Sequence, residues 1–336
     1  MKSMKKLVLV GLVLLASVMV LVGCKMEAEA AKVYTFPATV KVLTDYESPN
    51  NTDDTWTYVA FGEWPQSEAK GFTPTTQAIS YGIFKENYYE EDDGKYVKVD
   101  GKYYKVEPIV WRVLNKDYAS TGRALLLAEN ILTGGIPYYS VYNVKRTIGG
   151  VEIFTNNYEH SQIRAFLNGL SYEYKESDSA EQIEKDEYKD AGFLQTAFTP
   201  DVHNLIANTI VDNSARSTTD AEQNLPQATK YACGYTKDKI FLLSEQEATT
   251  AGYGFAAYDP REEGNTRIRV TTDYAQITGA YQDGTAGYGG WWWLRSPFYD
   301  DESCARIIRY DGSDFDVSYV YDAEVGVVPA LCIQLQ

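Results

Sequence analysis

Short runs of β-forming residues separated by turn residues are the feature that most constrains the fold of this chain. The clearest case is the pair of runs 96–99 and 102–106, which Asp100-Gly101 joins. An Asp-Gly dipeptide between two such runs is typical of a two-residue β-hairpin, because both of its residues accept a positive φ. Further strands are expected at 57–61, ending at Gly62, and at 109–114, 124–128 and 239–243.

Two helices are expected between the strand runs. The first covers 161–168, with Ser161 as the N-cap and Ile163, Phe166 and Leu167 on one face. The second begins at the cap residue Thr199, has Pro200 in its first turn, and carries apolar residues at helical spacing. These residues are Val202, Leu205, Ile206 and Ile210.

The segment 171–190 is rich in charge and has no sustained apolar face, so it is expected to be an exposed insertion. No internal repeat and no Pro/Gly-rich linker interrupts the chain after Lys32. The predicted fold class is therefore α+β, with antiparallel strands, two main helices and irregular inserts in one domain over 36–336.

The N-terminus carries a targeting segment that must be set aside before the fold is considered. A basic start is followed by an apolar run too short for a comfortable membrane span, which ends at Leu21-Val22-Gly23-Cys24. That ending resembles a bacterial lipobox, so 1–23 is predicted to be a lipoprotein signal peptide, Cys24 the lipidated residue, and 24–35 a tether. The protein is expected to be anchored by its lipid to a bacterial outer membrane and exposed at the surface. The alternative to a lipoprotein signal is an ordinary secretory signal, in which Cys24 is not lipidated.

Charge and motif content exclude several function classes. The net charge of −16 opposes nucleic-acid binding and binding to anionic headgroups, so only the lipid would hold the protein at a membrane. The chain has no Gly-x-Ser-x-Gly elbow, phosphate-binding loop or His-Glu-x-x-His motif. The acidic run 90–94 lacks the ligand spacing of a calcium loop and is expected to be a solvated turn, and Cys332 is expected to be buried. No catalytic residue, metal site or cofactor is predicted.

The C-terminal region is the most informative for function. Two apolar runs, 289–297 and 326–331, enclose the segment 298–325, which is rich in Tyr, Asp, Ser and Arg. Tyrosine gives large contact area at low rotamer cost and Asp, Ser and Arg give adaptable polar contacts, as in the binding loops of antibodies. A loop-rich polar end of a domain is the alternative. The candidate ligand-binding residues are Tyr299, Asp300, Asp301, Ser303, Cys304, Arg306, Ile308, Tyr310, Asp314, Phe315, Asp316, Ser318, Tyr319, Tyr321 and Asp322.

The same segment lacks four residue types. Lys, Gln, Met and Trp number 42 in the chain, yet none occurs in 298–325. All four are unreachable when the adenines of a pyrimidine-ending Asn codon are randomised, whereas Tyr, Asp, Ser, Cys, Arg, Phe and Ile are reachable. Glu302 and Glu324 are not reachable and would be fixed positions.

Four sequence motifs are similar to those of a known protein family. They are Trp292-Trp293-Leu294-Arg295-Ser296-Pro297, Gly326-Val327-Val328-Pro329-Ala330-Leu331, and the segments 61–66 and 109–113. Together they resemble the variable proteins of diversity-generating retroelements. The resemblance implies a C-type lectin fold of the formylglycine-generating-enzyme type, in which diversified side chains form a binding surface on a rigid scaffold. The variable region would span about 291–331, and Val328 stands where relatives commonly carry Arg. The implied scaffold residues are Trp291, Trp292, Trp293, Arg295 and Pro329.

The resulting hypothesis is a surface-anchored binding protein, not an enzyme, whose partner is an unknown macromolecular or cell-surface ligand. Tyrosines would supply apolar contact, and the carboxylates with Arg306 would favour a ligand with a basic patch. Which side chains face outward depends on strand register, because a one-residue slip inverts every position. Two alternatives remain: an exported oxidase of the formylglycine-generating type that uses Cys304, or a fixed carbohydrate-binding module.

Overall fold

The computed structural model describes residues 35–50, 56–218, 228–256, 265–313 and 316–336. The predicted signal peptide, Cys24 and the tether up to residue 34 lie outside the described residues, as do Asp314 and Phe315. Residues 34–336 form one compact unit of the chain. In the part of the chain that the structure describes, no helix is both long and apolar enough to cross a membrane.

The Asp-Gly hairpin forms where the sequence predicts it. Strands β5 (Gly94–Val99) and β6 (Lys102–Asn115) pair with Val99 opposite Lys102, so Asp100 and Gly101 alone form the turn. Both residues have positive φ, 48° and 79°, as a two-residue hairpin turn requires. The acidic turn also lies where it is expected, at the junction of β4 (Lys85–Glu91) and β5.

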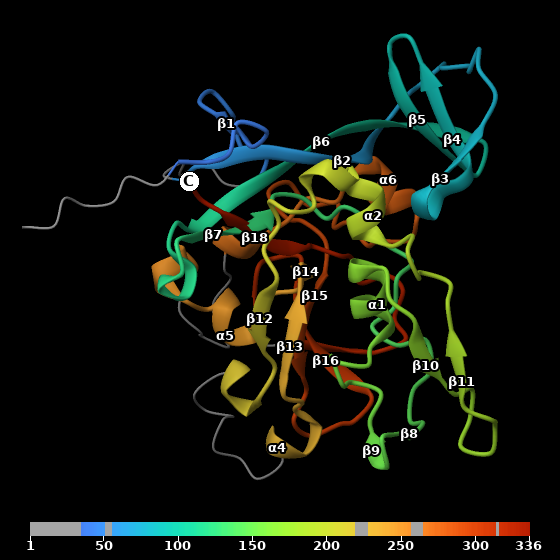
Figure 1. The fold of residues 1–336 in the computed structure, drawn as a ribbon, viewed down its shortest axis with the longest axis vertical. Coiled ribbons are helices and arrows are strands. Elements are labelled where there is room, and N and C mark those ends of the chain that lie inside the picture. The colour runs from blue at the N-terminus through green and yellow to red at the C-terminus, as the bar shows by residue number, and fades with distance from the viewer. Residues whose placement is uncertain (1–34, 51–55, 219–227, 257–264, 314–315) are drawn as a thin grey trace, which may run out of the picture. The chain divides into compact units, whose positions relative to one another are not determined.

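The hairpin belongs to the largest sheet among the described residues, which has nine strands (Figure 1). Its order is β14-β18-β7-β6-β5-β4-β3, and β2 pairs with both β6 and β1. Every strand pair in this sheet is antiparallel. The remaining strands are β1 (Lys41–Leu43), β2 (Tyr58–Glu68), β3 (Ile79–Tyr81), β7 (Arg123–Ala128), β14 (Ile240–Phe241) and β18 (Ala330–Gln334).

Two strands of this sheet are longer than the sequence predicts. Strand β2 does not end at Gly62 but continues to Glu68 through a bulge between Ala60 and Glu63. Gly62 has a φ of 72°, and a Cβ there would lie 2.4 Å from Cε1 of Phe198, so glycine lets the strand bend without stopping. Strand β6 likewise joins the second hairpin strand to the predicted strand 109–114 in one element.

Four smaller sheets contain the remaining strands of the described chain. Three are two-stranded: β8 (Arg146–Ile148) with β9 (Val151–Ile153), β10 (Tyr172–Tyr174) with β11 (Ile183–Lys185), and β12 (Thr209–Asp212) with β13 (Tyr235–Asp238). The fourth is three-stranded, in the order β15 (Trp292–Pro297), β16 (Cys304–Ile308) and β17 (Asp316–Tyr319). The architecture is therefore α+β with mostly antiparallel strands and short helices.

The first predicted helix is confirmed as α1 (Gln162–Asn168). The Ser161 side chain accepts a hydrogen bond from the Arg164 amide, and Ile163, Phe166 and Leu167 are buried. The other α-helices among the described residues are α2 (Phe193–Ala197), α4 (Ala228–Tyr231), α5 (Glu245–Ala248) and α6 (Asp273–Ile277). The 3-10 turns are η1 (Gly82–Phe84), η2 (Tyr118–Ser120), η3 (Pro200–Val202), η4 (Ala215–Ser217), η5 (Ala251–Tyr253) and η6 (Asn265–Arg267).

The second predicted helix is wrong beyond its first turn. Thr199 makes no side-chain cap, and only η3 forms. The chain then pairs with the edge of β18, where the Ala207 amide donates to the Cys332 carbonyl at 2.8 Å. Ile210, expected on the apolar helix face, lies in β12 with its side chain exposed. Hydrogen bonds to β18 replace those that a helix would have made within itself.

The predicted insertion is only partly exposed. It contains the β10–β11 hairpin, whose tip is solvated, but Tyr172 and Tyr188 are buried and stack on each other at 6.1 Å between ring centroids. Cys332 is buried as expected, and Cys233, Cys304 and Cys332 are all free thiols.

Candidate functional site

The candidate ligand-binding segment forms β16, β17 and the loops beside them. Strand β16 pairs with β15 on one side and with β17 on the other, with Cys304 opposite Tyr319 and Ile307 opposite Asp316. All five side chains of β16 are buried, whereas those of β17 are half-buried or exposed. Only part of the candidate segment therefore lies at the surface.

Four of the candidate residues point into the protein: Ser303, Cys304, Arg306 and Ile308. Arg306 Nε lies 3.4 Å from the carboxylate of Glu245, itself fully buried, and the guanidinium lies 4.9 Å from the ring centroid of Phe298. Burial, and then the charge of Asp301, raise the pKa of the Cys304 thiol to about 12. Because these four side chains are buried, they are not available at the surface for contact with a ligand.

Two candidate tyrosines join a third to form an exposed group that we call the tyrosine cluster. Tyr142, Tyr319 and Tyr321 are 56%, 51% and 43% exposed. The rings of Tyr319 and Tyr321 are nearly parallel with centroids 5.4 Å apart, and Tyr142 lies 5.1 Å from Tyr321 and 6.5 Å from Tyr319. Three large exposed rings in mutual contact form an aromatic surface patch, and exposed apolar patches are a feature of interaction sites.

Backbone hydrogen bonds hold the tyrosine cluster on the core. Val320 has no exposed surface, and its amide and carbonyl bind the Ser303 carbonyl and the Tyr139 amide, both at 2.9 Å. The buried hydroxyl of Ser303 accepts a hydrogen bond from the Asn143 amide at 3.0 Å. Ser303 thus joins the loop that carries Tyr142 to the segment that carries Tyr319 and Tyr321, and it acts as a support for the surface.

Carboxylates border this surface on β17 and just after it, and another lies in the loop before β16. Asp322 accepts a hydrogen bond from the Ser318 hydroxyl at 2.7 Å, and its other oxygen accepts one from the Glu324 amide at 2.9 Å. Asp316 forms an ion pair with Arg309 at 3.4 Å, both groups being about a third exposed. Asp300 is exposed, while Asp301 turns back to accept the Ser303 amide at 2.8 Å. The negative sign of this border favours a positively charged ligand.

The remaining candidate aromatics lie in other groups. Tyr310 contacts Tyr288 and Tyr281, with ring centroids 5.3 and 6.4 Å apart, and Tyr281 stacks on Trp291 at 4.5 Å. Tyr299 contacts Phe298 at 5.0 Å. All of these rings are half-buried, so the tyrosine cluster is the most exposed of the three groups.

The expected scaffold residues are mostly interior. Trp292 and Trp293 are fully buried, and Trp292 Nε1 donates to the Arg267 carbonyl at 3.1 Å. Arg295 is buried and forms an ion pair of 2.5 Å with Glu247. Pro329 is buried in the approach to β18, and Trp291 is half-buried.

Tyr142 is the contributor that sequence reasoning did not find. It lies more than 150 residues before the candidate segment, and nothing in Val141-Tyr142-Asn143 distinguishes it from the other tyrosines. Only the chain path brings it to the end of β17. Within the described ranges, no group of three or more His, Cys, Asp or Glu side chains could hold a metal ion.

Comparison with protein families gives one match. The family described as Domain of unknown function (DUF6273) matches residues 121–335, which include β15 to β18 and the whole tyrosine cluster. Comparisons with curated proteins and with solved structures found no match.

Proposed function

The chain belongs to the DUF6273 family, and we propose that it is a lipid-anchored binding protein of a bacterial surface whose C-terminal segment carries the ligand-binding site. The tyrosine cluster is the observation that carries this proposal. Its partner is a macromolecule, or a molecule on a cell surface, with a basic patch.

The physical support is the combination of a rigid base and an exposed aromatic surface. Tyrosine has only two side-chain torsions, so it loses little entropy on binding, and its ring and hydroxyl serve both apolar and polar contacts. Val320, between Tyr319 and Tyr321, is anchored in the core, so the two rings start from a fixed backbone. The carboxylates at the border add attraction for cations and raise the rate of encounter.

We also propose the finer assignments that follow from the resemblance. The fold would be a C-type lectin fold of the formylglycine-generating-enzyme type, and a retroelement would rewrite the variable positions. The buried tryptophans of β15 suit a constant scaffold, and the loops after β17 suit positions that change. Lipidation of Cys24 would hold the protein at the membrane, and nucleic acid is not among its partners.

Binding is favoured over the oxidase alternative by the state of the thiols. A nucleophilic or redox-active cysteine needs an accessible thiolate, and burial raises the pKa of Cys304 and of Cys332 to about 12. Cys304 and Cys332 are each unpaired.

The proposal is tested by sequencing this gene in many isolates. Differences should concentrate at exposed positions such as Tyr319, Tyr321 and Asp300, and Trp292 and Trp293 should stay constant. The differing codons should derive from template adenines. Differences spread evenly over the chain, or confined to β2 and β6, would contradict it.

The anchor has a separate test. Cells that express the full chain are labelled with a palmitate analogue, and the Cys24→Ala variant serves as the matched control. Label on the wild type alone is expected. Equal label on both proteins, or on neither, would remove the lipid anchor from the proposal.

A further inference from the structure

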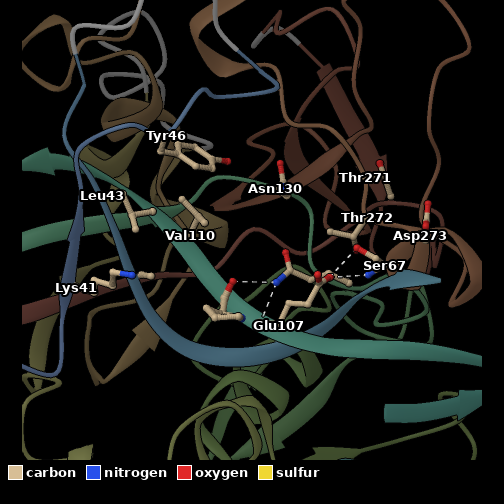
Figure 2. A pocket seen from close by; sticks show the side chains of 13 residues that line it. Lys41, Leu43, Tyr46, Ser67, Glu107, Val110, Asn130, Thr271, Thr272 and Asp273 are labelled. Atoms are coloured by element: carbon tan, nitrogen blue, oxygen red, sulfur yellow. Dashed lines mark hydrogen bonds between the residues drawn. The ribbon is translucent and has the colours of Figure 1, made fainter. Parts of the chain in front are cut away.

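A groove that shares no residue with the tyrosine cluster has the features of a second binding site. It has a volume of about 580 Å³, which lies within the range of small-ligand sites. Strands β1, β2 and β6 supply one wall, and Asn130 with the residues that lead into α6 supplies the other (Figure 2).

The lining of the groove mixes apolar and polar side chains, and its charged residues are separated. Ala60 on β2 pairs with Lys41 on β1 and with Val110 on β6, so these three residues form a row across the sheet. Figure 2 shows Lys41 at one end of the groove, Asp273 at the other, and Glu107 between them. The groove thus presents one cation and two carboxylates at different places along its length.

Each carboxylate is held by one of its oxygens. Glu107 Oε2 accepts hydrogen bonds from the Ser67 amide at 3.0 Å and from the Ser67 hydroxyl at 2.7 Å. Asp273 Oδ2 accepts one from the Glu68 amide at 2.9 Å. The second oxygen of each group, and the Lys41 ammonium, have no partner within the described part of the chain. The groove therefore holds two oriented carboxylates and one lysine, all three with unused bonding capacity.

The serine and threonine hydroxyls of the groove donate hydrogen bonds within the protein. Ser67 donates to Glu107, Thr271 donates to the Tyr281 carbonyl at 2.9 Å, and Thr272 donates to the Ile131 carbonyl at 3.2 Å. A ligand with ionised ends would use the charged groups that remain. The arrangement favours a dipolar ligand because charge-assisted hydrogen bonds are the stronger kind.

We propose that the groove binds a short zwitterionic peptide, with its carboxylate at Lys41 and its amino group at Glu107 and Asp273. Lys41 and Val110 lie two strands apart, so at about 4.8 Å per strand spacing their Cα atoms are about 10 Å apart. Glu107 lies about 10 Å from Val110 along β6. At roughly 3.5 Å per residue, an extended peptide of three or four residues spans about this distance.

The test is isothermal titration of the full-length protein with tri-alanine at low ionic strength. Saturable binding is expected, with a loss of affinity of about tenfold or more when the peptide is N-acetylated or C-amidated. The variants Lys41→Gln and Asp273→Asn should each lose a similar factor. Lys70→Gln, an exposed lysine outside the groove, is the matched control and should bind as the wild type does.

Each outcome decides the proposal. Thermal unfolding of every variant separates a lost contact from a lost fold, and Asp273→Asn keeps an oxygen for the Glu68 amide. Equal affinity for free and blocked peptides, unchanged binding by Lys41→Gln, or no saturable binding of tri-alanine would overturn the proposal. Binding of maltose in place of tri-alanine would overturn it in favour of a sugar site.

Discussion

Replacing Arg295 by Met should destabilise the protein far more than the loss of one contact suggests. The Arg295 side chain is 2% exposed and lies 2.5 Å from Glu247, which is 13% exposed. It also donates to the carbonyls of Leu242 at 2.7 Å and Asp212 at 3.1 Å. Methionine fills a similar volume but leaves the Glu247 charge without its counter-ion, a loss of about 3–5 kcal/mol in the free energy of unfolding.

The pH dependence of this loss is a second signature. Burial opposes ionisation of Glu247, but the charge and hydrogen bond of Arg295 outweigh it and hold the pKa of Glu247 below its ordinary value. In the wild type this group stabilises the fold above its ordinary pKa, and that stabilisation is lost as the pH falls through the lowered folded pKa. In Arg295→Met the hydrogen bonds from the Ser244 amide and the Tyr118 hydroxyl remain, but burial is no longer opposed by a cation. The folded pKa of Glu247 therefore rises relative to the wild type, so the penalty is largest at neutral pH and shrinks as Glu247 takes up a proton.

Urea unfolding at pH 7 and at pH 5 measures both effects. The double variant Arg295→Met with Glu247→Gln should recover part of the loss in the free energy of unfolding, because neither position then carries a buried charge. Lys102→Met is the matched control: its ion pair with Glu68 spans 3.2 Å at the surface, and its loss should cost less than about 1 kcal/mol. A loss below about 1 kcal/mol for Arg295→Met, or a loss that does not shrink at low pH, would refute the reasoning.

Three further predictions concern the backbone, the thiols and the surface rings. Gly62→Ala should destabilise the protein by about 1–3 kcal/mol in thermal unfolding, because the new Cβ meets Phe198 at 2.4 Å in a positive-φ conformation; Gly284→Ala, which meets nothing within 4 Å, should be near neutral. Cys332 should resist a thiol reagent at pH 8 until urea unfolds the chain, since burial raises its pKa to about 12; rapid labelling of the native protein would contradict this. Limited nitration read by mass spectrometry should modify the tyrosine cluster before the fully buried Tyr138, and equal rates would count against the exposure of the cluster.

Elements set by neighbouring residues could be predicted well. The Asp100-Gly101 hairpin needs positive φ at two adjacent residues, and those residue types supply it in any context. Helix α1 follows from the Ser161 cap and one apolar face. The second helix failed because its decisive partner, the edge of β18, lies about 125 residues further along the chain and takes the hydrogen bonds that a helix would use.

The sequence by itself determined the composition of the C-terminal segment, its two apolar flanks and the excess of negative charge. Only the tertiary structure decided which of its side chains meet solvent. Pairing on both edges buries β16, so Arg306 turns to Glu245 and Cys304 to the interior, while Tyr319 and Tyr321 remain outside. Tyr142 joins them because a distant loop binds Ser303 and Val320. Exposure depends on what packs against a residue, and that partner is set by contacts far apart in the chain.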